Sequence, residues 1–349
     1  MMFNLKLSAD QVNYLNIGLM IISAITAFIF PFETFLVVYA VLGPLHYLTE
    51  ISWLHDRHYF TKGKYDFILL LAAGVLITLA SLQLIPRITP GMATAITFFA
   101  FSTALIFVLV KNIYTRLLLI FLLFPLSGLV VKSDALSSVF SVFLPTIIHV
   151  FIFTGLFILV GALRGRSISG ISSLAVFILC TMSFFYLFPE RTGYIVSSNV
   201  KNNYHDFQML NYYLMTPFTK HDFNQPANIQ EYFQFVNNAL YQSRSAFAVM
   251  AFIGFAYMYH YLNWFSKTSV IQWHNISKSR LAGIIIIWLA SIGIYAYDYK
   301  LGLKWLFFLS FSHVLLEFPL NHLTFINIGK EFNNIFTGKR PAVKKVAAR

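Results

Sequence analysis

The residues best suited to chemistry in this sequence are histidines and glutamates inside apolar stretches. His46 and Glu50 stand four residues apart in one stretch, and His313 and Glu317 repeat the spacing near the other end of the chain. Residues four apart lie on one face of a helix, so each pair would present an imidazole and a carboxylate together. Ionisable groups at membrane depth are costly and usually functional. We therefore interpret both pairs as parts of one functional site.

Two further histidines, His149 and His260, also lie well inside apolar stretches. Neutral imidazoles from several helices would form a nitrogen-rich metal site, in which a carboxylate can ligate the metal or orient a ring. The predicted metal ligands are His46, His149, His260 and His313, and the predicted catalytic carboxylates are Glu50 and Glu317. Imidazole with carboxylate favours non-haem Fe(II), with zinc or copper as alternatives. The competing interpretation is that each histidine only forms hydrogen bonds between helices.

The composition predicts the setting of these residues. Hydrophobic residues make up 58% of the chain and charged residues 11%, against about 45–50% and about 25% in soluble domains. Long unbroken apolar runs favour helices over the alternating strands of a β-barrel. The net charge is +12, and the basic residues are spread through the loops. This distribution fits the positive-inside rule of membrane proteins better than it fits a nucleic-acid-binding surface. We predict an all-α polytopic membrane bundle with no nucleic-acid partner.

Ten apolar segments have about the length that spans the hydrocarbon core. They are 13–31, 34–54, 66–86, 91–110, 113–131, 137–162, 171–188, 245–265, 281–298 and 303–326. The whole chain, 1–349, is predicted to be a single membrane domain with about 10 transmembrane helices between 13 and 326. An even number of spans and the distribution of Lys and Arg predict that both termini are cytoplasmic, in a bacterial inner membrane.

This topology places the four histidines at one depth. They fall on even-numbered spans, which all run in the same direction, at similar distances from the start of each span. At about 1.5 Å per residue they can share a level in the membrane.

Two segments differ in composition from the spans. Residues 189–244 are rich in Asn, Gln, Tyr and Phe, which predicts short amphipathic helices on the outer surface. We interpret this segment as an extracytoplasmic cap loop. Residues 327–349 are basic and are predicted to form a cytoplasmic tail near lipid headgroups.

Taken in order, the four histidine sites resemble those of the Brp/Blh family of membrane β-carotene 15,15′-dioxygenases. The first, Leu45-His46-Tyr47-Leu48-Thr49-Glu50, is similar to the family's Pro-His-x3-Asp. The second is Ile147-Ile148-His149-Val150-Phe151, similar to Ile-Ile-His-Phe. The third is His260-Tyr261-Leu262-Asn263-Trp264-Phe265, similar to His-x3-His-Phe, and the last is Ser312-His313 followed by Glu317. The resemblance implies a shared helical bundle and a shared metal position, but it does not fix carotene as the substrate.

The chain departs from the family pattern at Trp264, which stands where the family has a second histidine in its third element. If that histidine is a ligand, His313, Glu50 or Glu317 would have to replace it. The long loop 189–244 is also foreign to the compact family pattern.

These observations predict a metal-dependent oxygenase that acts on an apolar lipid or an isoprenoid or carotenoid-like substrate drawn from the membrane. The predicted substrate pocket contains Tyr47, Tyr257, Tyr261 and Trp264. The main alternative is a proton- or metal-coupled transporter, because His and Glu in a membrane also suit a proton relay. The same residues are also compatible with a haem-binding electron carrier or with a structural membrane subunit. The chain has no Walker motif, which argues against nucleotide-driven transport.

Overall fold

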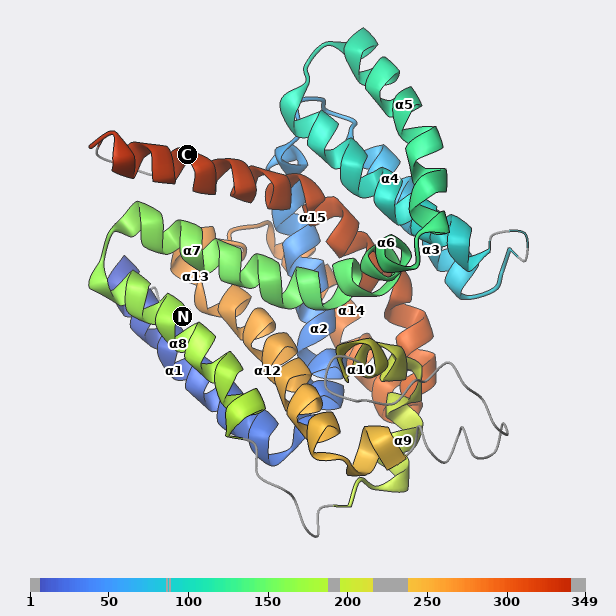
Figure 1. Cartoon of the computed structure of the whole chain (residues 1–349), viewed down its shortest axis with the longest axis vertical. Helices are drawn as coiled ribbons and strands as arrows, with labels where there is room; N and C mark the ends of the chain where they lie inside the picture. The colour runs from blue at the N-terminus through green and yellow to red at the C-terminus, as the bar shows by residue number, and fades with distance from the viewer. Residues whose placement is uncertain (1–6, 86, 88, 188–194, 216–237, 340–349) are drawn as a thin grey trace.

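The computed structural model describes residues 7–85, 87, 89–187, 195–215 and 238–339. Over these residues the fold is an all-α bundle, as the composition predicts (Figure 1). The longer helices are α1 (Ala9–Ile29), α2 (Pro31–His55), α3 (Phe67–Ser81), α4 (Pro90–Leu109), α5 (Ile113–Lys132), α8 (Ile168–Tyr186), α12 (Arg244–Ser266), α14 (Lys278–Tyr297) and α15 (Tyr299–Phe336). The shorter elements are η1 (His58–Phe60), α6 (Asp134–Ser138), η2 (Val139–Phe153), α7 (Thr154–Gly165), α9 (Ser198–Tyr204), η3 (His205–Phe207), α10 (Gln208–Met215) and α13 (Thr268–Ile271).

Nine helical segments of the described chain are long and apolar enough to cross a membrane. One of them, Asp134–Gly165, consists of α6, η2 and α7 in succession. The shorter α3 is also apolar. Each of the ten predicted segments therefore corresponds to an apolar helix. Large apolar side chains such as Phe121 and Leu118 of α5 are exposed, and exposed apolar surface of this kind is typical of contact with lipid.

Polar residues directly before the apolar runs begin several of these helices. The side chains of Ser8, Thr89, Ser243, Ser277 and Asp298 each accept a hydrogen bond from the backbone N–H three residues further on. Such N-caps satisfy one of the donors that a helix start leaves free and contribute about 1 kcal/mol each. The caps thus fix where α12 and α15, which carry two of the histidines, begin.

Helix α12 occupies the centre of the bundle. In the most apolar 18-residue stretch of α12, 83% of the residues are buried, against 11% in the corresponding stretch of α5. It packs against α1, α2, α8 and η2, and Figure 1 shows it between the α1–α8 pair and α2. A histidine on α12 can therefore meet residues from several neighbours.

Prolines interrupt the three other elements that carry the predicted ligands. Pro44 lies inside α2, Pro145 inside η2 and Pro319 inside α15. Proline removes a backbone donor and bends a helix. Element η2 is a π-helix, a form that is frequent at functional sites. A backbone donor is thus missing in three of the four elements that carry the predicted ligands, and η2 is in addition a π-helix, whereas α2 and α15 continue as α-helices through their prolines.

The predicted cap loop, 189–244, lies partly outside the described residues. Its described part contains α9, η3 and α10, and Tyr204 of α9 packs edge-on against Phe32 and Phe35 of α2. Helix α15 continues to Phe336, beyond the predicted end of the last span at 326. The side of the membrane on which these segments lie stays a prediction.

Candidate metal centre

His46 and Glu50 lie together on one face of α2, as their spacing predicts. Nε2 of His46 is 3.0 Å from Oε2 of Glu50, and the two side chains are 1% and 3% exposed. Pro44, two residues before the histidine, interrupts the hydrogen bonding of the helix here. The pair is therefore enclosed by protein and close to a position where the helix lacks one backbone donor.

His313 and Glu317 have the same spacing on α15 but make a different set of contacts. Nε2 of His313 lies 3.0 Å from Nε2 of His149, and Oε2 of Glu317 lies 3.1 Å from Nδ1 of His149. His149 belongs to η2. His313 and Glu317 thus both contact the imidazole of His149 on the neighbouring element η2.

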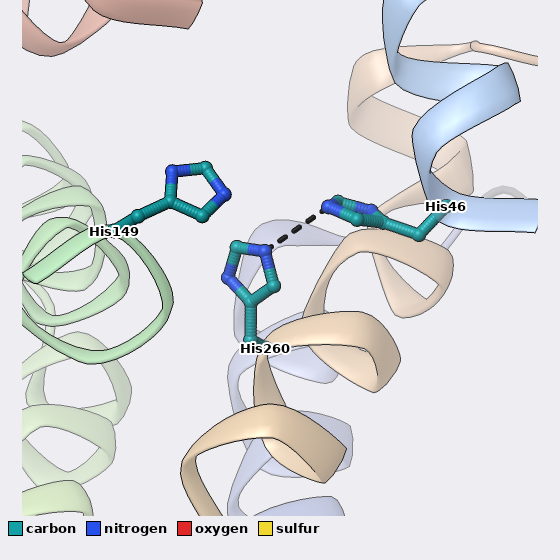
Figure 2. Close-up of side chains that lie close together, drawn as sticks. All are labelled: His46, His149 and His260. Carbon is teal, nitrogen blue, oxygen red and sulfur yellow. Dashed lines mark hydrogen bonds between the residues drawn. The ribbon is translucent and has the colours of Figure 1, made fainter. Parts of the chain in front are cut away.

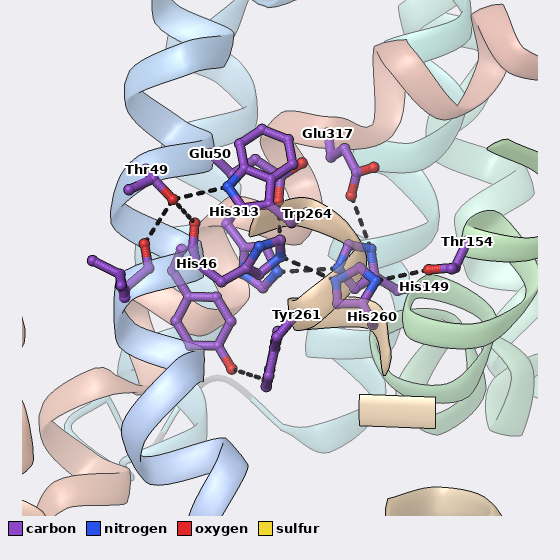
Figure 3. Close-up of polar contacts among 12 residues, drawn as sticks. His46, Thr49, Glu50, His149, Thr154, His260, Tyr261, Trp264, His313 and Glu317 are labelled. Atoms are coloured by element: carbon purple, nitrogen blue, oxygen red, sulfur yellow. Dashed lines mark hydrogen bonds and ion pairs between the residues drawn. The ribbon is translucent and has the colours of Figure 1, made fainter. Parts of the chain in front are cut away.

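His260 of α12 completes the cluster. Its Nε2 lies 3.0 Å from Nε2 of His46, and all four imidazoles are buried. Figure 2 shows His46, His149 and His260 turned toward one space from three different helices. Figure 3 adds His313 and the two carboxylates. The four histidines predicted as ligands are therefore brought together, although they lie far apart in the sequence.

The donor atoms are spaced as the ligands of a metal ion would be. Two sets, His46 with His149 and His260, and His46 with Glu50 and His313, each have ligand atoms within 4.8 Å of one another. Two nitrogens that bind one ion at about 2.1 Å and at a right angle are about 3.0 Å apart. Both nitrogen–nitrogen contacts in the cluster have this separation.

Several buried atoms of the cluster have no hydrogen-bond partner among the described residues. They are Nδ1 of His46, His149 and His313, and Oε2 of Glu50 and Glu317. The two carboxylate oxygens approach ring nitrogens closely but without the geometry of a hydrogen bond. An unpartnered buried polar atom costs about 1–3 kcal/mol. A cation bound by the two carboxylate oxygens would remove this cost for those atoms and neutralise buried negative charge.

A threonine outside the predicted site holds one of the rings. Oγ1 of Thr154, the first residue of α7, lies 2.8 Å from Nδ1 of His260. If His260 ligates a metal through Nε2, its Nδ1–H donates to this oxygen, which fixes the tautomer and the ring plane. No spacing rule connects Thr154 to His260, so sequence reasoning did not find it.

Aromatic residues form the walls around the histidines. The Tyr47 ring stacks on His313 with centroids 4.2 Å apart, and its hydroxyl lies 2.8 Å from that of Tyr261. Trp264 packs edge-on against His46, and its Nε1 donates to Oγ1 of Thr49 at 3.0 Å. Trp264 therefore supports the His46 ring from the side.

A cavity of about 1,040 Å³ reaches the cluster, and His149 and His313 form part of its wall. Of the residues predicted for a substrate pocket, Tyr47, Tyr257 and Tyr261 line this cavity. Trp264 does not lie on the cavity wall and instead packs against His46. Whether any of the four contacts a substrate stays a prediction.

Another buried histidine lies apart from the cluster. His322, on α15, is 8% exposed, and its Nε2 lies 2.8 Å from the carbonyl oxygen of Phe101 on α4. His322 forms a simple interhelical hydrogen bond, which is what the interpretation without a metal expects of every buried histidine. The four clustered histidines differ from His322 in their partners, since imidazoles there face other imidazoles and carboxylates.

No family model, no curated protein and no solved structure matches this chain. The resemblance to the Brp/Blh family therefore stays a prediction from the short histidine motifs.

Proposed function

We propose that this protein is a membrane-embedded, histidine-ligated metalloenzyme, a non-haem iron oxygenase that oxidises an apolar lipid or an isoprenoid or carotenoid-like substrate. One observation carries the proposal: four imidazoles and two carboxylates meet in the protein interior beside a large cavity. Pockets of about 300–1,000 Å³ are typical of small-molecule sites, so a cavity of about 1,040 Å³ has room for a lipid-sized molecule. The resemblance of the histidine motifs to those of the Brp/Blh family supports the same reaction class.

The donor set supports the choice of metal. Imidazole nitrogens with carboxylate oxygens favour Fe(II), although zinc and copper also bind imidazole. The proposed ligands are His46, His149, His260 and His313. Iron, when bound there, would supply the activation of dioxygen.

The proposed catalytic carboxylates act through the contacts that they make. Glu50 lies 3.0 Å from the His46 ring and Glu317 lies 3.1 Å from the His149 ring. At these distances they can orient the imidazoles or accept a proton during the reaction. Tyr47, Tyr257 and Tyr261 would hold the apolar substrate and exclude water from the histidines.

Oxygen uptake by the purified protein tests this proposal. The protein would be loaded anaerobically with Fe(II) and mixed with oxygen and either β-carotene or a membrane lipid extract. We expect uptake by the wild type, and none by His149→Ala or by the zinc-loaded protein. His322→Ala is the matched control, because it removes a buried histidine that lies apart from the cluster. Equal uptake by the wild type and His149→Ala would contradict the proposal.

A proton- or metal-coupled transporter is the second candidate. The observation that favours it is a continuous series of contacts from Glu50 through His46 and His260 to Thr154. Such a series could pass a proton within the membrane. Proton or metal flux into proteoliposomes that is lost in Glu50→Gln would favour transport, whereas absence of flux would remove this candidate.

We also propose that the chain lies in a bacterial inner membrane with both termini in the cytoplasm. The nine apolar helices of the described chain support a membrane location. With the shorter apolar α3 counted as a tenth span, the loop distribution of basic residues supports placing both termini on the cytoplasmic side. Reporter fusions at the two ends would test it, and activity of a periplasm-specific reporter at either end would overturn it.

A further inference from the structure

The cavity that reaches the histidine cluster has a chemically different end. Besides the buried imidazoles of His149 and His313, its wall includes the ammonium-bearing side chains of Lys300 and Lys304. Both lysines are exposed. The cavity therefore connects a buried polar cluster with a pair of surface cations.

The two lysines are four residues apart on α15, so they lie on one face of its first turns. Within the described chain, neither lies within ion-pair distance of a carboxylate. The carboxylate of Asp298, which precedes them, accepts the capping hydrogen bond from Leu301. The lysines thus carry positive charge that no described side chain compensates directly.

One carboxylate shares the cavity wall with the lysines. Asp206 lines the cavity, and its Oδ1 lies 3.3 Å from Nδ1 of the neighbouring His205. The described lining therefore contains two cations and one anion, and its net charge favours a negatively charged group.

The wall between the two ends is mainly apolar along α15. Leu303, which lies between the two lysines along the helix, and Phe307 and Phe311, which lie between Lys304 and His313, all line the cavity. Nine residues separate Lys304 from His313, which corresponds to about 14 Å along the helix axis. Along α15 the cavity wall thus presents first cations, then apolar side chains and then, about half a helical turn round the axis from Lys304, an imidazole of the cluster.

We propose that this cavity binds an amphiphile with an anionic head group, a phosphate or a carboxylate, at Lys300 and Lys304, and places its apolar tail against the histidine cluster. A neutral hydrocarbon would gain nothing from the two lysines, whereas a head group fixed there would set which part of the tail faces the histidines. The assignment of this amphiphile as a substrate rests on the proposed metalloenzyme function. Its binding does not.

Matched ligands test the proposal. Binding of oleyl phosphate, oleyl alcohol and inorganic phosphate would be measured by titration calorimetry in a nonionic detergent, with wild type and with Lys300→Gln/Lys304→Gln. We expect the wild type to prefer oleyl phosphate over the alcohol, and the double variant to bind the phosphate about tenfold more weakly, the factor that corresponds to about 1.4 kcal/mol from two exposed charge contacts. Binding of the alcohol should not change.

The control is Lys278→Gln, which removes an exposed lysine at the start of α14 and away from the cavity wall. Lys278→Gln should keep the wild-type preference for oleyl phosphate. In the wild type this preference should weaken as salt is added, because salt screens exposed charges. Equal binding of oleyl phosphate and oleyl alcohol by the wild type would overturn the proposal. So would an unchanged preference in the double variant, or binding of inorganic phosphate with no gain from the tail.

The same titration with a chelator present separates this inference from the proposed function. The lysines are about 14 Å or more from His313 along α15, so the head-group preference should persist without metal. Protein that holds no iron, zinc or copper as purified, before any chelator is added, but keeps the preference would overturn the metalloenzyme proposal alone. A protein that holds iron but shows no preference would overturn the head-group site alone.

Discussion

Replacing Thr154 by valine removes the hydroxyl that contacts Nδ1 of His260 and keeps a branched side chain of similar shape. Thr154 is 1% exposed, and its contact with the ring is 2.8 Å long. Water has little access to replace the lost partner, so the ring nitrogen would be left buried without a hydrogen bond. Removing a hydrogen-bond partner of a ligating histidine typically lowers metal affinity about 10- to 100-fold, and the unpartnered nitrogen lowers the free energy of unfolding by about 1–3 kcal/mol.

Two measurements separate these effects. Metal affinity would be obtained by competition with a chromophoric chelator, and stability from the thermal unfolding of the metal-free protein. Thr324→Val is the matched control, because Thr324 is also buried but donates to Leu320 of its own helix at 2.9 Å. It should lose little metal affinity. If Thr154→Val binds the metal as tightly as the wild type, then the hydroxyl does not orient a ligand and our view of His260 is wrong.

Three further predictions follow from other contacts. Glu317→Gln keeps the shape of the side chain but removes the charge beside His149, so metal affinity should fall about 10- to 100-fold in the same competition assay; an unchanged affinity would contradict an orienting role. Asp66→Asn keeps a side-chain oxygen but removes the negative charge that the buried Arg116 contacts at 2.8 Å, and should lower the free energy of unfolding by about 3–5 kcal/mol with no change in metal affinity; a smaller loss in thermal unfolding would mean that Arg116 reaches water. Removing the metal with a chelator should lower the unfolding temperature, because a ligand at 100 times its Kd stabilises a protein by about 2.7 kcal/mol; an unchanged temperature would mean that the native protein carries no metal.

The helices of this protein could be predicted from the sequence because two local signals agree. Apolar runs mark the membrane-spanning lengths, and capping residues such as Ser243 and Asp298 mark where α12 and α15 begin. Helix ends were less predictable. Helix α15 continues to Phe336, since hydropathy reports the apolar part of a helix and not the hydrogen bonding that carries it further.

The division of the predicted segment 137–162 was not predictable from hydropathy. It contains the end of α6, the whole of the π-helix η2 and most of α7, because the hydrogen-bond pattern around Pro145 changes while the hydrophobicity does not. This change of pattern occurs in the element that carries His149 and just before Thr154.

The members of the site could be predicted, but not their contacts. Ionisable side chains are rare at membrane depth. For this reason the sequence alone could identify His46, His149, His260 and His313, without any knowledge of packing. The identical spacing of the two His–Glu pairs predicted identical arrangements, yet Glu317 contacts a histidine on another element. Such contacts depend on how neighbouring helices are placed, and that information is not local in the sequence.

Elemental analysis of the detergent-purified protein tests the central claim most directly. It would compare the wild type with His149→Ala and with the control His322→Ala, and circular dichroism would confirm that each is folded. We predict stoichiometric iron in the wild type and in His322→Ala, and its loss from His149→Ala. Wild-type protein that is folded and active in ligand binding but holds no iron, zinc or copper would contradict the account, as would full metal retention by His149→Ala.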